Sequence, residues 1–436
     1  MAQLAEQAFA KEEKRKAEKP IATGAKAVEI ARSLFGLNAV DGSIKDLDSY
    51  DDRNFYMRAT HARPELVGAE DANEVEKDLP GADSAADVAT PGAQYHFVLK
   101  IHNGVESLEP AFIECQNLAM EAVRASSGVW CPRAMPALDG ERIARARLTL
   151  ANGVERDHAV RCLPFRPGVL FADVSLSPGL LHSLGTATAR VSASLLGFDH
   201  PAAHRTAFIW DLANTASVRS LLHHSPSERH AMLAGVIDEF ESNVLPRASE
   251  LRSATIHGDI NDQNVLVDAL GERVLGIIDF GDMAHSWLIN EIAIAAAYTV
   301  IALHYGVASS TAAPSAPQAT DESVAKNEDA GAGTPAGGSL LTEMEALAAI
   351  VSSYAAEMAS HSLALTSAEW SVLPTLIACR ITVSLIIGAY SSAQDPTNEY
   401  LKLTQLPGWT ALQRLRALPA TEVANRLRAA ADAAAM

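Results

Sequence analysis

The sequence has few cysteines and a shortage of basic residues. Its 436 residues include four cysteines, scattered without a C-x-x-C pair or a cluster with histidine at zinc-ligand spacing. This argues against a disulfide framework or a zinc site, and it favours a reducing, cytoplasmic location. Lys and Arg number 35 against 53 Asp and Glu, which gives a formal charge of −18. That balance excludes a nucleic-acid binder that relies on a basic surface.

Long apolar runs are also missing. The longest apolar stretch, residues 292–303, is shorter than the roughly 20 residues that cross a bilayer, and the apolar run 375–389 contains Arg380. Residues 1–19 mix five basic with four acidic side chains and lack the apolar core of a secretory signal. We therefore expect no membrane segment, and we expect a flexible N-terminus over residues 1–20.

Two segments are poor in large apolar residues. Residues 61–94 contain eight acidic and two basic residues, and residues 308–339 consist mainly of Ala, Ser, Thr, Gly and Pro. Neither segment can bury enough apolar surface to offset the entropy of ordering. We predict two disordered, solvated insertions. The alternative is that these tracts form an acidic surface for a specific partner.

The spacing of apolar residues changes along the chain. Up to residue 163 it predicts mainly strands, interrupted by one helix that begins near Pro110 and ends near Gly128. The strands are expected at 54–59, 95–101, 143–150 and 158–163. Beyond residue 164 apolar residues recur at helical spacing, at 180–195, 236–244 and 341–358. We therefore predict an α+β protein with two lobes, a small antiparallel-sheet lobe over 21–163 and a larger, mostly helical lobe over 164–436.

The helical lobe contains one embedded hairpin, residues 256–280, which turns at Gly271. It carries His257-Gly258-Asp259-Ile260-Asn261-Asp262-Gln263-Asn264 and, fifteen residues past Asn264, Asp279-Phe280-Gly281-Asp282. This is the pattern H-x-D-x-x-x-x-N followed by D-F-G, which in phosphotransferases supplies the catalytic base and the metal ligands.

Each residue type in this pattern suits a chemical role. An aspartate such as Asp259 can accept the proton of a substrate hydroxyl. Mg²⁺ prefers oxygen ligands, which Asn264 and Asp279 offer from opposing strand ends. We place His257 at the catalytic site, where we expect it to brace the loop by hydrogen bonds. The same residue types also cap surface turns, but both halves of the motif on strand ends favour catalysis.

The phosphotransferase template also requires a lysine on a strand of the small lobe and a glutamate on the next helix. Lys100 and Glu114 have these positions, so we expect Lys100 to hold the α- and β-phosphates of a nucleotide and Glu114 to hold Lys100. No G-x-G-x-x-G precedes Lys100. We expect the loop 49–55 to cover the phosphates instead, with Arg53, Asn54 and backbone N–H groups as contacts. The two aspartates of this loop would repel phosphate unless they face elsewhere.

These motifs, together with Glu291-Ile292-Ala293, resemble the aminoglycoside phosphotransferase and choline kinase superfamily, which has a protein-kinase-like fold. The stretch 49–55 points to the hydroxylysine kinase branch, and the resemblance extends over about residues 31–390 apart from the insertions. It implies Mg²⁺-dependent transfer of the γ-phosphate of GTP or ATP to an amino alcohol, 5-hydroxylysine in that branch.

An acceptor with an ammonium group requires carboxylates nearby. The candidates are Asp262, Asp282 and Asp211, although Asp211 is equally suited to cap a helix. The second insertion interrupts the lobe that builds the acceptor pocket, so homoserine, choline or an aminoglycoside remain alternative acceptors. A non-catalytic nucleotide-binding protein is the other alternative, and the sequence leaves the oligomeric state open.

Overall fold

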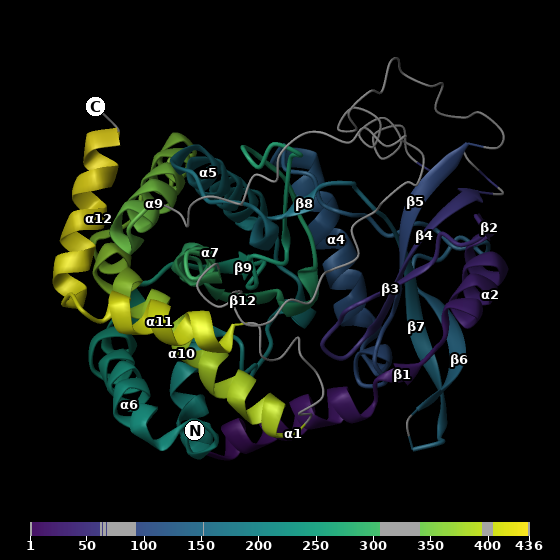
Figure 1. Cartoon of the computed structure of the whole chain (residues 1–436), viewed down its shortest axis with the longest axis horizontal. Helices are drawn as coiled ribbons and strands as arrows, with labels where there is room; N and C mark the ends of the chain where they lie inside the picture. The colour runs from purple at the N-terminus through teal and green to yellow at the C-terminus, as the bar shows by residue number, and fades with distance from the viewer. Residues whose placement is uncertain are drawn as a thin grey trace, which may run out of the picture.

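The computed structural model describes residues 2–61, 63, 67, 93–150, 152–305, 341–394 and 404–434. Figure 1 shows a sheet-rich part and a helix-rich part side by side, in the order that the sequence predicts. Nearly all of the two predicted insertions, 61–94 and 308–339, lies outside the described residues. The division at residue 163 and the disorder of the insertions therefore stay predictions.

The N-terminal part forms one antiparallel sheet, which has seven strands in the described part of the chain. They are β1 (Pro20–Ile21), β2 (Leu37–Ala39), β3 (Lys45–Leu47), β4 (Arg53–His61), β5 (Gln94–Ile101), β6 (Ala144–Leu150) and β7 (Glu155–Pro164). Their order is β1-β6-β7-β5-β4-β2, and β3 pairs with β4. All four predicted strands are present as β4 to β7, which confirms the small antiparallel sheet.

Helix α2 (Gly24–Phe35) covers one face of this sheet. The Thr23 side chain accepts a hydrogen bond from the first turn, and Gly36 ends the helix with a φ of 67°. Apolar residues at helical spacing and at alternate strand positions form the small core: Ala27, Ile30, Ala31, Phe35, Phe55, Met57, Phe97 and Leu99. Successive strand residues point to opposite faces. Asn54 and Lys100, which are cross-strand partners, therefore point to the other face.

Helix α1 (Ala2–Ala17) occupies the segment that we expected to be flexible. This prediction is wrong, because Glu12 and Arg15 are buried in the structure. The mixed charges resemble a solvated tail in sequence, but Arg15 forms ion pairs with Asp51 and Glu106, residues far along the chain. The partners that order this helix are thus contributed by the tertiary structure.

The C-terminal part is mostly helical, as predicted. Its α-helices are α5 (Pro178–Leu195), α6 (His230–Glu239), α7 (Ile289–Ala302), α9 (Glu343–Ser360), α10 (Ser367–Gln394), α11 (Gln405–Leu415) and α12 (Ala420–Ala434). The helix α4 (Pro110–Ser126) packs between the sheet and these helices, and the 3₁₀ segment η5 (Leu212–His224) packs against α10. One large hydrophobic core connects α4 with the C-terminal helices.

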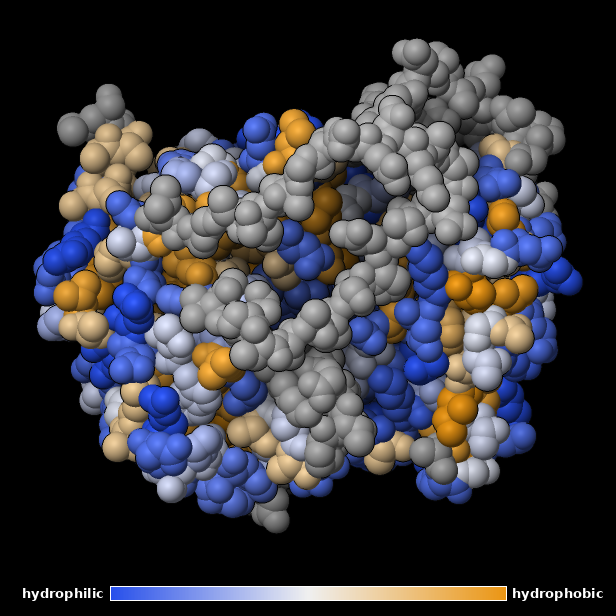
Figure 2. All heavy atoms as spheres, in the orientation of Figure 1, coloured by the Kyte–Doolittle hydropathy of each residue, from blue (hydrophilic) through white to orange (hydrophobic). Residues whose placement is uncertain are grey.

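Helix α10 is long and apolar enough to cross a membrane by length and composition alone. In the structure, 89% of its most apolar window is buried inside the protein. The face seen in Figure 2 is largely polar, with apolar residues in small groups. Thus α10 is the central helix of the large core, and Arg380 lies in its interior.

Two short sheets carry the predicted hairpin. Strand β10 (Val265–Val267) pairs with β11 (Val274–Ile277) and β8 (Val169–Leu170), while β9 (Ser253–Ile256) pairs with β12 (Ala284–Trp287). The turn between β10 and β11 contains Gly271 at a φ of 67°, where glycine is favoured. The loop 257–264 therefore joins the two sheets, and the segment 278–283 returns from one to the other.

Candidate active site

Asp259 lies in the loop between β9 and β10 and has three polar partners. Its Oδ2 accepts hydrogen bonds from the side-chain amides of Asn261 and Asn264, both at 2.9 Å. Its Oδ1 accepts one from Nη2 of Arg380 at 2.6 Å. The side chain nevertheless keeps 17% of its surface exposed. This carboxylate is fixed in orientation and still open to a substrate hydroxyl.

Arg380 is a fully buried cation beside this carboxylate. Its guanidinium lies 5.2 Å from the ring centre of Trp210 and 5.3 Å from that of Tyr298, and it donates to the Trp210 carbonyl at 3.1 Å. Burial raises the pKa of Asp259 well above its usual range, and Arg380 opposes that shift. A raised pKa makes a carboxylate a stronger base, while the adjacent cation favours its ionised form.

Asn264 and Asp279 lie at the same end of the hairpin. The backbone N–H of Ile278 donates to the Asn264 carbonyl at 2.9 Å, which brings the two predicted metal ligands together. Asp279 has a φ of 61°, a conformation uncommon outside glycine that is often found at functional sites. Its carboxylate is 45% exposed, and the amide oxygen of Asn264 has no hydrogen-bond partner among the described residues. Two such oxygens fit the hard cation Mg²⁺.

His257 braces the loop, as the sequence predicts. Its Nε2 contacts the Ile278 carbonyl at 3.1 Å, and its Nδ1 accepts from the backbone N–H of Asp259 at 3.2 Å. This arrangement suits the neutral ring, and burial lowers the pKa of His257 to about 4. Both ring nitrogens are occupied, so His257 holds the two loops together and does not face a substrate.

Glu291, at the start of α7, also fixes the loop 257–264. Its carboxylate oxygens accept from the backbone N–H groups of His257 at 2.6 Å and Gly258 at 3.0 Å. Burial raises its pKa to about 7, an effect that these two N–H groups oppose. Gly258 has a φ of 77°, and a Cβ atom there would lie 2.7 Å from the Asp282 carbonyl oxygen. Only glycine fits this position without strain.

Lys100 reaches across from β5 to the catalytic hairpin. Its Nζ lies 3.2 Å from Oδ1 of Asp279 and 3.3 Å from Oδ2 of Asp52. Burial lowers the pKa of Lys100, but Asp279 and Asp52 outweigh this and hold it above its usual value. Burial likewise opposes ionisation of Asp279, and Lys100 outweighs it to lower that pKa. The predicted position of Lys100 at the nucleotide end of the site is thus consistent with the geometry.

Glu114 does not hold Lys100, contrary to our expectation. Its carboxylate forms an ion pair with Arg142 and accepts a hydrogen bond from Asn117 at 2.9 Å. Glu114 lies near enough to Arg161, the cross-strand neighbour of Lys100, to favour the charged form of that arginine, but no contact within the described residues joins it to Lys100. Spacing along the chain places a glutamate on the correct helix, but it does not determine which side of the helix faces the lysine.

Arg53 also departs from its predicted role. Its guanidinium contacts Asp46 at 2.5 Å and the Ala22 carbonyl at 3.1 Å. Strand alternation places it on the face opposite Lys100, so it is not positioned for phosphate. Asn54 is on the same face as Lys100, and its Oδ1 is buried without a partner among the described residues. Asn54 therefore stays a candidate for nucleotide contact.

The three carboxylates proposed for the acceptor have different surroundings. Asp211 caps η5 by accepting from the Ala213 N–H at 3.0 Å, and it accepts from Ser286 at 2.5 Å, so the capping alternative is the one observed. Asp262 accepts from the Tyr305 hydroxyl at 2.6 Å. The carboxylate of Asp282 makes no hydrogen bond within the described residues. Burial raises its pKa, an effect that neighbouring arginines partly offset.

Sequence reasoning missed Arg380 and Asp52 as parts of this site. In the sequence, Arg380 only interrupts an apolar run. A single arginine within such a run is itself a signal, because a buried cation requires a partner. The charge of Asp52 alone predicts repulsion of phosphate. In the structure its Oδ1 accepts from the backbone and side-chain amides of Asn103, at 2.8 Å and 3.0 Å, and its Oδ2 faces Lys100.

Comparisons with known proteins show which proteins this chain is similar to. A hydroxylysine kinase of Mus musculus is 28% identical to this chain, over 91% of this chain and 90% of its own length. A hydroxylysine kinase of Danio rerio is 26% identical, over 94% of this chain and 96% of its own length. Among solved structures, a microcompartment-associated aminopropanol kinase aligns with a TM-score of 0.55 at 16% identity, covering 93% of this chain and 98% of its own. The amicoumacin kinase hAmiN aligns with a TM-score of 0.54 at 14% identity, covering 93% and 94%.

These two structures share the fold of this chain, which confirms the two-lobed, protein-kinase-like α+β class. The model of the phosphotransferase enzyme family matches residues 77–313, more than half of the chain. That match includes Lys100 and the whole catalytic hairpin. The chain therefore belongs to the phosphotransferase enzyme family, as a small-molecule kinase that acts on an alcohol group.

Proposed function

We propose that this kinase transfers the γ-phosphate of GTP or ATP to the hydroxyl of an amino alcohol, and we favour 5-hydroxylysine as the acceptor. The observation that carries the proposal is the environment of Asp259. This partly exposed carboxylate is fixed by Arg380 and lies 2.9 Å from the side-chain amide of Asn264. The acceptor is inferred from the hydroxylysine kinases, which align over nearly the whole of this chain.

In the proposed reaction, Asp259 accepts the proton of the acceptor hydroxyl as the oxygen bonds to the γ-phosphorus. The bond from this phosphorus to the bridging oxygen breaks, and the nucleoside diphosphate leaves. Lys100 contacts the phosphates from the small lobe. Asn264 and Asp279 would hold Mg²⁺, which would neutralise charge on the phosphate oxygens. His257 keeps the two loops in register and transfers no proton.

An ammonium group on the acceptor requires a carboxylate whose oxygens are free to accept hydrogen bonds. Asp282 fits this role best, since Asp211 caps a helix and Asp262 accepts from Tyr305. Asp282 also lies three residues past Asp279, the proposed metal ligand, in the same short segment. We therefore assign ammonium recognition to Asp282 first and to Asp262 second.

The test is a coupled assay of nucleoside diphosphate release by the purified protein. Hydroxylysine, homoserine, choline and an aminoglycoside serve as acceptors, each with ATP and GTP in parallel. Highest kcat/KM with hydroxylysine supports the proposal, while preference for another acceptor replaces it. No turnover with any pair, combined with tight nucleotide binding, would favour the non-catalytic alternative.

The variant Asp259→Asn tests the base within the same assay. We expect turnover to fall by about two to four orders of magnitude, as for loss of a general base, while nucleotide affinity stays within about threefold. Asp199→Asn is the matched control, because Asp199 is 74% exposed on the surface of the same lobe. Wild-type turnover in Asp259→Asn would show that the base assignment is wrong.

We also infer that the enzyme works in the cytoplasm as a soluble protein. The four cysteines are all buried and none is in a disulfide, as is usual in a reducing compartment. A small-molecule acceptor needs no membrane or nucleic-acid partner.

A further inference from the structure

The nucleotide lysine of this protein has an unexpected partner. In place of a glutamate from α4, Lys100 contacts Asp52, which directly precedes β4. Arg53 pairs with Ile101 in the sheet, so Asp52 lies opposite His102 at the strand end. Asp52 is 5% exposed and is held by two hydrogen bonds from Asn103. The position of the Lys100 ammonium therefore depends on what fixes this strand end.

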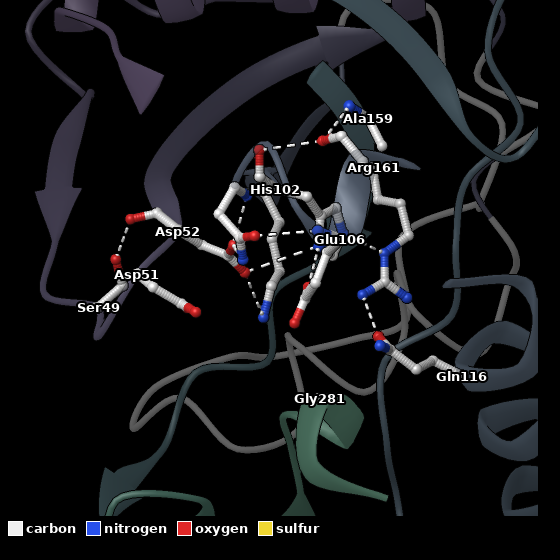
Figure 3. A network of polar contacts seen from close by, with 12 residues as sticks. Ser49, Asp51, Asp52, His102, Glu106, Gln116, Ala159, Arg161 and Gly281 are labelled. Atoms are coloured by element: carbon white, nitrogen blue, oxygen red, sulfur yellow. Dashed lines mark hydrogen bonds and ion pairs between the residues drawn. The ribbon is translucent and has the colours of Figure 1, made fainter. Parts of the chain in front are cut away.

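A buried chain of contacts continues from Asp52. Figure 3 shows Asp52, His102 and Glu106 pointing toward one another, with Arg161 on the far side of His102. His102 Nδ1 lies 3.7 Å from Oδ2 of Asp52 and 2.9 Å from Oε2 of Glu106. Arg161 Nε donates to His102 Nε2 at 3.1 Å. Since Nε2 accepts, Nδ1 carries the proton and donates it to Glu106, so the neutral ring has every nitrogen partnered.

The chain ends at Arg15 of helix α1. Its Nη2 lies 2.8 Å from Oε1 of Glu106 and its Nε lies 2.6 Å from Oδ2 of Asp51, the neighbour of Asp52. All three side chains are more than nine-tenths buried. The Arg15 guanidinium thus contacts Asp51, which precedes Asp52 in the chain, and also Glu106, which contacts His102. Glu12 of the same helix is a third partner, at 3.5 Å, and a buried cation among three carboxylates is a fixed geometry that a solvated pair does not provide.

Helix α1 also contacts the other lobe. The Lys16 ammonium donates to Ser391 Oγ at 2.6 Å, the Tyr390 hydroxyl bonds to Glu13, and the Phe9 ring lies 6.3 Å from that of Tyr390. Figure 1 shows α1 running from beneath the C-terminal helices to the sheet. Helix α1, which carries Arg15, is therefore held by contacts with both lobes.

A different reading of this cluster is a metal site. The ligand atoms of Asp52, His102 and Glu106 lie within 4.8 Å of one another. However, the two carboxylates are already paired with the cations Lys100 and Arg15. Both nitrogens of His102 have partners. A cation in the centre would have to displace these groups, so the contacts favour a positioning network.

We propose that Arg15 is a positioning residue for nucleotide binding, which acts through Glu106, His102 and Asp52 to fix the ammonium of Lys100. The inference rests on the proposed function in one respect, that Lys100 contacts the nucleotide phosphates. It assigns to α1, a helix outside the catalytic motifs, a part in the nucleotide site. Asp259, the proposed base, does not belong to this chain of contacts.

The test compares Arg15→Met with wild type in two readouts. The first is the affinity for a fluorescent N-methylanthraniloyl nucleotide in Mg²⁺ without acceptor, and the second is steady-state KM for nucleotide and for acceptor. We expect nucleotide affinity, measured without acceptor, to fall at least tenfold and nucleotide KM to rise in parallel, while the acceptor KM reports separately on Asp282, whose ionised form Arg15 also favours. Arg15→Lys, which keeps the charge, is expected to recover part of the loss.

Lys11→Met is the matched control on the same helix. Lys11 pairs with Glu109, but the two side chains are 48% and 46% exposed, and such pairs contribute little. We expect this variant to bind nucleotide like wild type. If Arg15→Met does not fold, as judged by circular dichroism and thermal unfolding, Glu106→Gln decides the question with the same readouts.

A double-mutant cycle separates a relay from a general loss of stability. If Arg15 acts through Asp52, the losses in nucleotide affinity of Arg15→Met and Asp52→Asn are strongly non-additive. If the fold-loss in nucleotide affinity of the double variant equals the product of the two single fold-losses, the proposal is overturned. An unchanged nucleotide affinity in a folded Arg15→Met protein would also overturn it. A wild-type protein that binds nucleotide but phosphorylates no acceptor would contradict the proposed function alone, since the binding readout needs no acceptor.

Discussion

The ion pair between Arg380 and Asp259 gives the sharpest prediction about catalysis. We consider the substitution Arg380→Met, which keeps most of the side-chain volume and removes the charge. Arg380 is 1% exposed and its Nη2 lies 2.6 Å from Oδ1 of Asp259. The variant leaves Asp259 with the amides of Asn261 and Asn264 as its hydrogen-bond donors.

Two magnitudes follow from this geometry. Removing one partner of a buried ion pair costs about 3–5 kcal/mol of unfolding free energy, and the partial exposure of Asp259 favours the lower end. An opposite charge at this range typically lowers a carboxyl pKa by about 1–3 units. Burial already raises the pKa of Asp259, and loss of Arg380 raises it further. The acidic limb of the activity profile is therefore expected to move upward by about 1–3 pH units.

The size of the stability loss in Arg380→Met also depends on pH. In the variant, the folded protein holds a proton on Asp259 more tightly than the unfolded chain, whose carboxyl has a pKa near about 4. Between that value and the raised folded pKa, the folded state binds more protons. Its stability therefore falls as the pH rises through this window. The destabilisation is smallest in acid, where the carboxyl is neutral in both states.

The assay measures kcat/KM for the acceptor against pH in wild type, Arg380→Met and Arg380→Lys, with thermal unfolding at each pH. Arg219→Met is the control, because Arg219 pairs with Asp238 on the exposed surface of the same lobe. The double variant Asp259→Asn/Arg380→Met has no uncompensated charge at this position, so we expect it to unfold at a higher temperature than Arg380→Met. An unshifted acidic limb in a folded Arg380→Met enzyme would refute the reasoning.

Two further substitutions test the catalytic hairpin. In Asp279→Asn the new side chain tolerates the left-handed backbone but lacks the charge. We therefore expect nucleotide affinity in Mg²⁺ to fall at least tenfold, while affinity in EDTA stays nearly constant. An unchanged Mg²⁺ dependence in a binding titration would show that Asp279 is not a metal ligand. Gly258→Ala places a Cβ 2.7 Å from the Asp282 carbonyl at a φ of 77°, so we expect loss of turnover and of about 1–2 kcal/mol or more in stability. Gly235→Ala in α6, where a Cβ would have no neighbour within 4 Å, should stabilise the protein in the same unfolding assay; equal effects of the two alanines would contradict the assignment.

The catalytic hairpin could be predicted because its geometry is local. Asp259, Asn264 and Asp279 lie on loops joined by short strands, and strand pairing alone brings their ends together. The side of the sheet on which Lys100 lies can also be predicted from the sequence, because alternation along β5 separates it from Phe97 and Leu99, which lie in the core. Alternation along β4 likewise places Arg53 on the face opposite Lys100.

The partners of these residues could not be predicted in the same way. Arg380 is 121 positions from Asp259, and Arg15 reaches Glu106 from another element. No local spacing encodes which distant charge fills a buried position. Glu114 illustrates a related limit, because the rotation of a helix on its axis is set by packing against its neighbours. Helical periodicity predicts which residues share a face, but not what that face contacts.

The cations around the two ends of the site share one packing interface. Arg380 belongs to α10 and Arg15 to α1, and these helices touch where Lys16 donates to Ser391 at 2.6 Å. Tyr50, in the loop before β4, also contacts Ser391 at 3.0 Å. A displacement of one lobe relative to the other would therefore disturb the support of Asp259 and that of Lys100 together. Because phosphoryl transfer depends chiefly on positioning and charge, we expect this shared contact to couple the proposed base to the proposed phosphate site without any direct bond between them.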